Sequence, residues 1–143
     1  MPPPDGATRV AAVIGDPVRH SLSPVLHNAA FAALGLHWVY VAFEVPEGRA
    51  AEAVGAVRSL GIEGLSVTMP HKAAVALAVD RCSLVAQRLE AVNCVRRQGA
   101  DLVGENTDGD GFLDEHETIT TWPWGQNFHE FAFGLLYRDG HFY

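Results

Sequence analysis

The sequence has little cysteine, few basic residues and no long hydrophobic run. Its two cysteines, Cys82 and Cys94, form no C-x-x-C pair, so we expect free thiols in a reducing, cytoplasmic environment. The chain has 10 basic and 17 acidic residues, and the net charge of -7 argues against a nucleic-acid surface. No run approaches the length of a membrane span, and residues 1–8 lack the features of a signal peptide. We therefore expect a disordered lead-in at 1–8, and no nucleic-acid or membrane partner.

Several motifs of nucleotide-binding and hydrolytic enzymes are also absent from the sequence. It contains no G-x-x-x-x-G-K phosphate loop, no G-x-G-x-x-G dinucleotide-binding turn and no nucleophile elbow of a Ser/His/Asp hydrolase. Three histidines near the C-terminus, His116, His129 and His141, are spaced too irregularly for a zinc site. The sequence therefore predicts neither a metal site nor a cofactor-binding turn.

The first hundred residues alternate between apolar runs and helical patterns. The runs at 9–14, 38–45 and 62–68 are rich in apolar, β-branched or aromatic residues and are followed by turn residues, which predicts three strands. Apolar residues recur at helical spacing at 49–60, which predicts a helix. Two short strands at 91–97 and 100–104, joined by a Gln-Gly turn, are expected to form a hairpin.

A further helix is expected to begin at Ser23 and Pro24, because serine is a common N-cap and proline a common first helical residue. It ends before Gly35 and carries apolar residues on one side. They are Val25, Leu26, Ala29, Ala30, Ala33 and Leu34. Short helices are also expected at 71–78 and 83–89.

Strands that alternate with helices and end in a hairpin predict an α/β fold, a single domain whose mixed, mainly parallel sheet is flanked by helices. The composition then changes near Asp114. Residues 115–143 hold eight of the 13 aromatic residues but only one alanine. We therefore expect a domain at 9–114, followed by a divergent, aromatic-rich tail whose fold the sequence does not indicate.

Two polar side chains follow the third predicted strand. Thr68 comes at its end and Lys72 lies just beyond Pro70, which forces the backbone to turn. A lysine at a strand end can donate a proton or bind an anion, and a nearby hydroxyl can orient an oxygenated ligand. The alternative is structural, with a threonine that caps a helix and a lysine in solvent.

Two other polar segments are candidates for the same site. Ser21 and Ser23 precede a helix and could bind a carboxylate together with the exposed N–H groups of the first helical turn. The loop 106–111 is rich in Asn, Asp and Gly, which is also typical of a plain turn, and it lacks the spacing of a calcium loop. Its functional interpretation is that Asp108 supplies a carboxylate beside Lys72.

Four segments, taken in order, resemble the substrate-binding domain of shikimate dehydrogenase. They are Gly-Asp-Pro-Val-Arg-His-Ser-Leu-Ser-Pro at 15–24, Gly-Leu-Ser-Val-Thr-Met-Pro-His-Lys at 64–72, Ala-Val-Asn at 91–93 and Gly-Glu-Asn-Thr-Asp-Gly at 104–109. The resemblance extends over about residues 10–113. Ser66 stands where that family usually has asparagine.

The resemblance implies a site for shikimate or 3-dehydroshikimate. The residues that it assigns to this site are Ser21, Ser23, Thr68, Lys72, Asn93 and Asp108. The serines would hold the substrate carboxylate, and the threonine, asparagine and aspartate would bond its hydroxyls. Lys72, paired with Asp108, would transfer the proton. In the family's reaction NADPH reduces the ketone of 3-dehydroshikimate, a step of the shikimate pathway that leads through chorismate to aromatic amino acids.

The family continues from this domain into a nicotinamide-binding domain, which residues 115–143 do not resemble. We therefore expect a truncated, catalytically incomplete chain without a cofactor site, and its status as an enzyme stays open. One alternative is a non-catalytic module that binds a polyol acid, or that binds a partner or a second copy through its aromatic tail. Another is a relative of quinate or aminoshikimate dehydrogenase.

Overall fold

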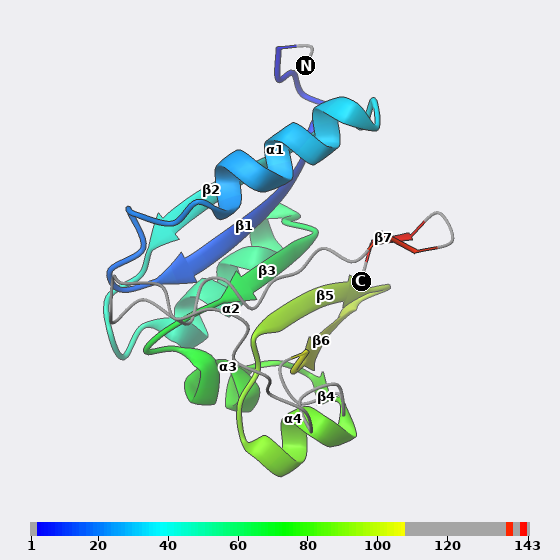
Figure 1. The fold of residues 1–143 in the computed structure, drawn as a ribbon. Helices are drawn as coiled ribbons and strands as arrows, with labels where there is room; N and C mark the ends of the chain where they lie inside the picture. Colours follow the sequence, from blue (N-terminus) through cyan, green and yellow to red (C-terminus); the bar gives the residue numbers. More distant parts are fainter. Residues whose placement is uncertain (1–2, 108–136, 139–140, 143) are drawn as a thin grey trace, which may run out of the picture.

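The computed structural model describes residues 3–107, 137–138 and 141–142 (Figure 1). Strands and helices alternate first, as β1 (Arg9–Gly15), α1 (Ser23–Ala33), β2 (Trp38–Glu44), α2 (Ala50–Leu60), β3 (Gly64–Val67) and α3 (Lys72–Ala78). They are followed by β4 (Arg81–Cys82), α4 (Leu84–Leu89), β5 (Cys94–Gln98) and β6 (Asp101–Glu105). A separate pair, β7 (Tyr137–Arg138) and β8 (His141–Phe142), lies in the predicted tail. The rest of that tail, and the boundary near Asp114, lie outside the described residues.

The main sheet has six strands in the order β2-β1-β3-β5-β6-β4. β1 runs parallel to β2 and β3, and β4 runs parallel to β6. β5 is antiparallel to both β3 and β6, and the pair β5–β6 is the hairpin expected from the sequence. The predicted α/β fold with a mixed, mainly parallel sheet is therefore confirmed.

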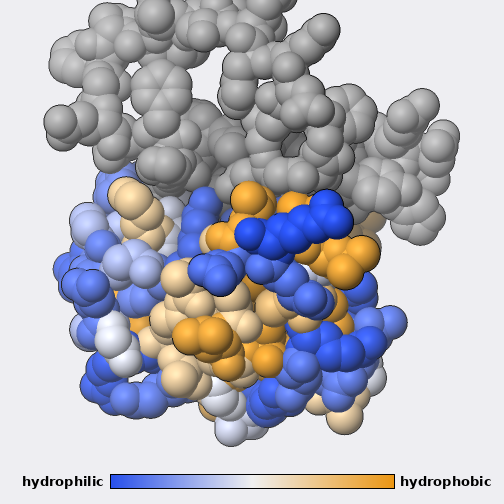
Figure 2. All heavy atoms as spheres, turned by 90° about the horizontal axis from the view of Figure 1, so that it is seen from below, coloured by the Kyte–Doolittle hydropathy of each residue, from blue (hydrophilic) through white to orange (hydrophobic). Residues whose placement is uncertain are grey.

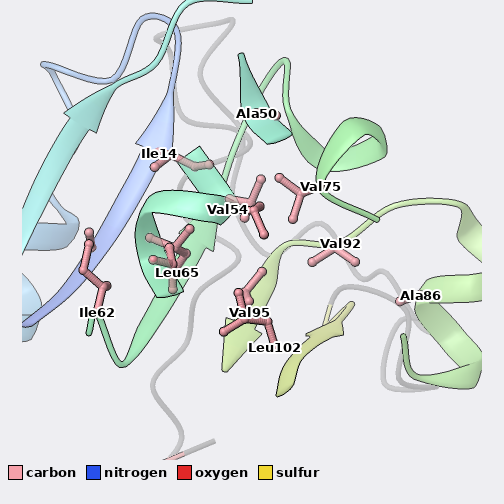
Figure 3. Close-up of a cluster of buried hydrophobic side chains, with 13 residues drawn as sticks. Ile14, Ala50, Val54, Ile62, Leu65, Val75, Ala86, Val92, Val95 and Leu102 are labelled. Atoms are coloured by element: carbon pink, nitrogen blue, oxygen red, sulfur yellow. The ribbon is translucent and has the colours of Figure 1, made fainter. Parts of the chain in front are cut away.

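The larger core lies between one face of the sheet and the helices α2, α3 and α4 (Figure 3). Apolar side chains alternate along each strand, so that every second residue of β1 and β3 points into this core. The buried residues of this core are Ala12, Ile14, Ala50, Val54, Val57, Ile62, Leu65, Val67, Val75, Ala86, Val92, Val95 and Leu102. This layer fixes the ends of β1 and β3 relative to the start of α3.

α1 covers the opposite face of the sheet, over β1 and β2, and packs there through Phe31, while most of the apolar residues predicted to share one side are exposed. Val25 and Leu26 are 66% and 57% exposed. The side chain of Asn28 instead bonds the backbone of Tyr40 on the edge strand β2, and the ring of His27 stacks on that of Tyr40. These polar and ring contacts set the rotation of the helix, which a count of apolar residues could not indicate.

The start of α1 also differs from the sequence-based expectation. The N-cap is Leu22, and Ser23 is the first helical residue, without a capping hydrogen bond from its side chain. Ser21 has the role expected of Ser23, because its Oγ accepts a hydrogen bond of 3.2 Å from the backbone N–H of Ser23. The prediction that Ser23 is the N-cap was therefore wrong, because the cap position is Leu22, one residue earlier. At α4, by contrast, Ser83 is a true N-cap.

Three further expectations concern the described part of the chain. Its longest helices, α1 and α2, have 11 residues each, and none of its helices is long and apolar enough to cross a membrane. Both cysteines are free thiols, as expected. Within the ranges that the structure describes, no group of three or more His, Cys, Asp and Glu side chains could hold a metal ion.

Candidate functional site

The candidate site lies where two adjacent parallel strands, β1 and β3, end. The backbone N–H of Thr68 donates to the carbonyl of Ile14 (3.0 Å), and that of Asp16 donates to the carbonyl of Met69 (3.0 Å). Both turns continue through cis peptide bonds, Asp16–Pro17 and Met69–Pro70. In open α/β sheets, ligands bind outside the carboxyl ends of the strands, and this is such a place.

Gly15 allows the two strand ends to approach closely. A Cβ atom at this position would lie 2.5 Å from Cγ2 of Thr68 and 3.3 Å from Cβ of Val18. Thr68 itself is 6% exposed, so its side chain is held against β1. The glycine therefore determines where the Thr68 hydroxyl stands.

Two backbone hydrogen bonds bring Asn93 to the same place as Thr68 and Lys72. The N–H of Val67, the residue before Thr68, donates to the carbonyl of Asn93 (2.8 Å). The N–H of Val92, the residue before Asn93, donates to the carbonyl of Lys72 (2.9 Å). Asn93, more than 20 residues from Thr68 and Lys72 in the sequence, is thus their neighbour in the fold.

The side chain of Asn93 is fully buried and is hydrogen-bonded to Thr107. Its Nδ2 donates to Oγ1 of Thr107 (2.9 Å), and its Oδ1 accepts from the backbone N–H of Thr107 (3.1 Å). An amide has two N–H groups and two lone pairs, so these bonds use one of each. In the structure Asn93 holds the residue that precedes Asp108. Asp108 itself, the expected partner of Lys72, lies outside the described residues.

Lys72 is the first residue of α3 and lines a pocket of about 400 Å³ between the start of α3 and the end of α4. The other residues around this pocket are Met69, Pro70, Ala73, Leu89, Glu90 and Ala91. Ser21, Thr68 and Asn93 are not among the residues that line this pocket.

The surface beside this pocket is partly apolar. Figure 2 shows the lower side of Figure 1, where α3 and α4 lie, and hydrophobic residues gather there among hydrophilic ones. Leu77 and Leu84 are the most exposed large hydrophobic residues of these two helices, at 90% and 73%. Exposed apolar side chains therefore lie on the same two helices that contribute Ala73 and Leu89 to the pocket.

The two serines lie at the start of α1, after the turn that follows β1. The N–H of Ser21 donates to the carbonyl of Val18 (3.0 Å), and Ser23 is buried. Of the six side chains expected at the site, the structure therefore places five at the same end of the sheet: Ser21, Ser23, Thr68, Lys72 and Asn93.

Sequence reasoning missed two buried polar side chains near the site. Nε2 of His71, which is 1% exposed, donates to the carbonyl of Val45 (2.7 Å) and so ties the start of α3 to the end of β2. The hydroxyl of Tyr40 donates to Oγ of Ser66 (2.7 Å). Burial raises the pKa of Tyr40 to about 12, so the phenol stays neutral. The alternation of β2 could have indicated that Tyr40 faces inward, but not what its hydroxyl reaches.

The residues that the structure describes do not fit the pyrophosphate of a dinucleotide. Such a group needs a glycine-rich turn between a strand and a helix, where the backbone can approach the phosphates closely. Among residues 3–107, no turn between a strand and a helix has this pattern. Gly15, which ends β1, is closed over by Thr68.

Residues 13–95 match the family model described as the shikimate dehydrogenase substrate binding domain. The chain belongs to this family. Its match extends over more than half of the sequence and includes the ends of β1 and β3, α1, α3 and Asn93. The family resemblance inferred from the four sequence segments is therefore confirmed.

Known members of the family are similar over the same part of the chain. The shikimate dehydrogenase (NADP(+)) of Geobacter metallireducens is 52% identical over 108 residues, which are 76% of this chain and 38% of that protein. The shikimate 5-dehydrogenase of Listeria monocytogenes, solved in complex with shikimate and NAD, is 40% identical with a TM-score of 0.72, over 76% of this chain and 38% of that one.

A relative that is named for a substrate other than shikimate is also similar in sequence and structure. The ligand-free 5-ketofructose reductase of a Gluconobacter species is 28% identical with a TM-score of 0.71, over 81% of this chain and 42% of that one. The chain thus spans less than half of the length of each of these three proteins.

Proposed function

We propose that this chain binds shikimate or 3-dehydroshikimate, and that the domain at 9–114 is the substrate-binding part of an NADP-dependent shikimate dehydrogenase. The observation that carries the proposal is the convergence of the site residues. The backbone bonds between Val67 and Asn93 and between Val92 and Lys72 gather hydroxyl, amide and ammonium groups at one end of the sheet. A cyclic acid with several hydroxyls needs such a set of donors and acceptors.

The start of α1 would hold the substrate carboxylate. Ser21 and Ser23 supply hydroxyls there, and the first N–H groups of a helix attract an anion. Thr68, Asn93 and Asp108 would bond the hydroxyls at the other end of the ring. The remaining N–H group and lone pair of the Asn93 amide suit this role.

Lys72 would act on the reacting oxygen. When the ketone is reduced, negative charge develops on its oxygen, and a nearby ammonium group stabilises that charge and can donate the proton. Asp108 would pair with the lysine and favour its charged form. In the complete reaction NADPH is the hydride donor, and we assign none of its contacts to residues 3–107.

The test uses the fact that Lys72 is the only lysine of the sequence. Reductive methylation with a 13C label marks the ε-amine of Lys72 and the N-terminal amine, and it keeps their positive charge. Titration with shikimate is expected to shift the Lys72 signal in a saturable way and to leave the N-terminal signal unchanged. Calorimetry on the unlabelled chain checks the affinity.

Two controls make the test specific. Cyclohex-1-ene-1-carboxylate, which keeps the ring and the acid of shikimate but lacks its hydroxyls, should bind much more weakly. Ser59→Ala removes a hydroxyl that bonds only the carbonyl of Gly55 on α2, and it should bind shikimate as the wild type does. If millimolar shikimate shifts neither signal and gives no heat, the proposed binding function is wrong, and an interaction module is favoured instead.

A second candidate substrate is a related acid such as quinate. A relative named for a different substrate, 5-ketofructose, is similar in structure, so proteins of similar structure differ in their substrates. Competition between quinate and shikimate in the same titration decides between them, because the preferred ligand displaces the other at the lower concentration.

The chain's own turnover is a separate question with its own assay. We expect no oxidation of NADPH when the 143-residue chain is mixed with NADPH and 3-dehydroshikimate, because its described residues do not fit the dinucleotide. Oxidation above that of a Lys72→Ala control would show that this expectation is wrong.

A further inference from the structure

Tyr40 contacts both of the elements that carry the proposed site. It is the third of the seven residues of the edge strand β2, and it is 4% exposed. The side chain of Asn28 on α1 holds its backbone at both ends: Oδ1 accepts from the N–H of Tyr40 (2.8 Å), and Nδ2 donates to its carbonyl (2.9 Å). The edge of the sheet is thus fastened to α1 at this residue.

The ring of Tyr40 is enclosed between α1 and the sheet. It stacks on His27 of α1, with ring centroids 4.1 Å apart and planes at 11°. It also belongs to the small core with Val13 and Val18, which lie on β1 and in the turn after it. The side chain therefore passes over β1 toward the next strand.

The hydroxyl of Tyr40 reaches β3. It donates to Oγ of Ser66 at 2.7 Å, and Ser66 lies two residues before Thr68. Residues two apart in a strand share a face, so this bond fixes the position of β3 two residues before Thr68. A phenylalanine would fill the same space, and what distinguishes the tyrosine is this one bond. Since burial raises the pKa of Tyr40 to about 12, the hydroxyl keeps its proton for the bond.

We propose that Tyr40 is a positioning residue that sets the distance between Ser21 and Ser23 at the start of α1 and Thr68 at the end of β3. It does not touch the ligand and acts through Asn28, His27 and Ser66. The inference rests on the proposed binding function, because it concerns two ends of one ligand. A ligand that spans both ends depends on this distance, and a ligand held at one end does not.

The experiment compares Tyr40→Phe and Ser66→Ala with the wild type in titrations with two ligands. Shikimate engages both ends of the site, and cyclohex-1-ene-1-carboxylate engages only the end that holds the carboxylate. We expect both variants to bind shikimate about twofold to tenfold more weakly, a loss within the net free energy of one neutral hydrogen bond. Binding of the carboxylate fragment should change by less than about twofold. The double variant should lose no more than either single one, because both remove the same bond.

Other outcomes would overturn the proposal. Equal losses for both ligands would mean that the hydroxyl supports only general stability. Unchanged shikimate binding in Tyr40→Phe would mean that the bond positions nothing. Ser59→Ala, whose hydroxyl lies on α2, is the matched control and should behave as the wild type with either ligand.

Failure of the proposed function is recognised separately. If the wild type binds neither ligand, the amide signals in a 15N correlation spectrum of Tyr40→Phe decide the positioning claim. Shifts at Ser21, Ser23 and Thr68 would support it without any ligand. Shifts confined to Ser66 and the neighbours of Tyr40 in sequence would overturn it.

Discussion

Replacing Gly15 by alanine is expected to destabilise the chain by about 1–3 kcal/mol, the usual cost of overpacking. The added Cβ would lie 2.5 Å from Cγ2 of Thr68 and 3.3 Å from the carbonyl oxygen of Met69. Carbon atoms in contact prefer separations of about 3.5–4.0 Å, so Thr68 would have to move by about 1 Å. It cannot rotate away freely, because its β-branched side chain is buried and stiff at χ1.

Urea unfolding measures this effect, with Gly55→Ala as the matched control. Gly55 lies inside α2, and apart from its chain neighbours and the backbone of its own helix no atom would lie within 4 Å of a Cβ added there. Alanine is favoured over glycine in a helix interior, so this variant should be more stable by about 0.5–1 kcal/mol. The two substitutions are chemically the same, but they should change the free energy of unfolding in opposite directions. A Gly15→Ala variant as stable as the wild type would refute the reasoning about the strand ends.

Three other substitutions test particular hydrogen bonds. Asn93→Ala removes both bonds to Thr107 and should lower the free energy of unfolding in urea by about 1–3 kcal/mol; no change would show that the bonds do not hold this segment. Ser83→Ala removes the N-cap of α4 and should cost about 0.5–2 kcal/mol in the same assay, whereas an unchanged midpoint would contradict the cap. The hydrogen bond from the N–H of Leu102 lowers the pKa of Asp80. The ionised Asp80 therefore stabilises the fold above about pH 4, and this stabilisation is lost as the pH falls through the lowered pKa. Asp80→Asn should thus lose less stability than the wild type between neutral and acid pH, and equal losses would count against this assignment.

The alternation of strands and helices could be predicted well because each element carries a local signal. The strand at 9–14 is apolar after Arg9, and it is observed as Arg9–Gly15. The helix at 49–60 has a clear period and is observed as Ala50–Leu60. The hairpin was indicated by its Gln-Gly turn, and Gly99 has a φ of 63°, which suits a glycine.

The packing side of α1 and the roles of the buried polar groups could not be predicted. The rotation of α1 depends on Asn28 meeting the backbone of Tyr40, which is a contact between elements. The amide of Asn93 could be placed near the site by resemblance, but its bonds to Thr107 depend on the way β5 and β6 pair. In both cases the decisive partner is distant in sequence and leaves no periodic signal.

The most direct test of the proposed function is the titration of the single lysine with shikimate. We predict a saturable shift of the 13C-methyl signal of Lys72 with one binding site per chain, and calorimetry that gives the same affinity for the unlabelled protein. Asn93→Ala should weaken this binding, and Ser59→Ala should not. A Lys72 signal that does not move at millimolar shikimate, with no heat in calorimetry, would contradict the assignment of this strand end as a shikimate site.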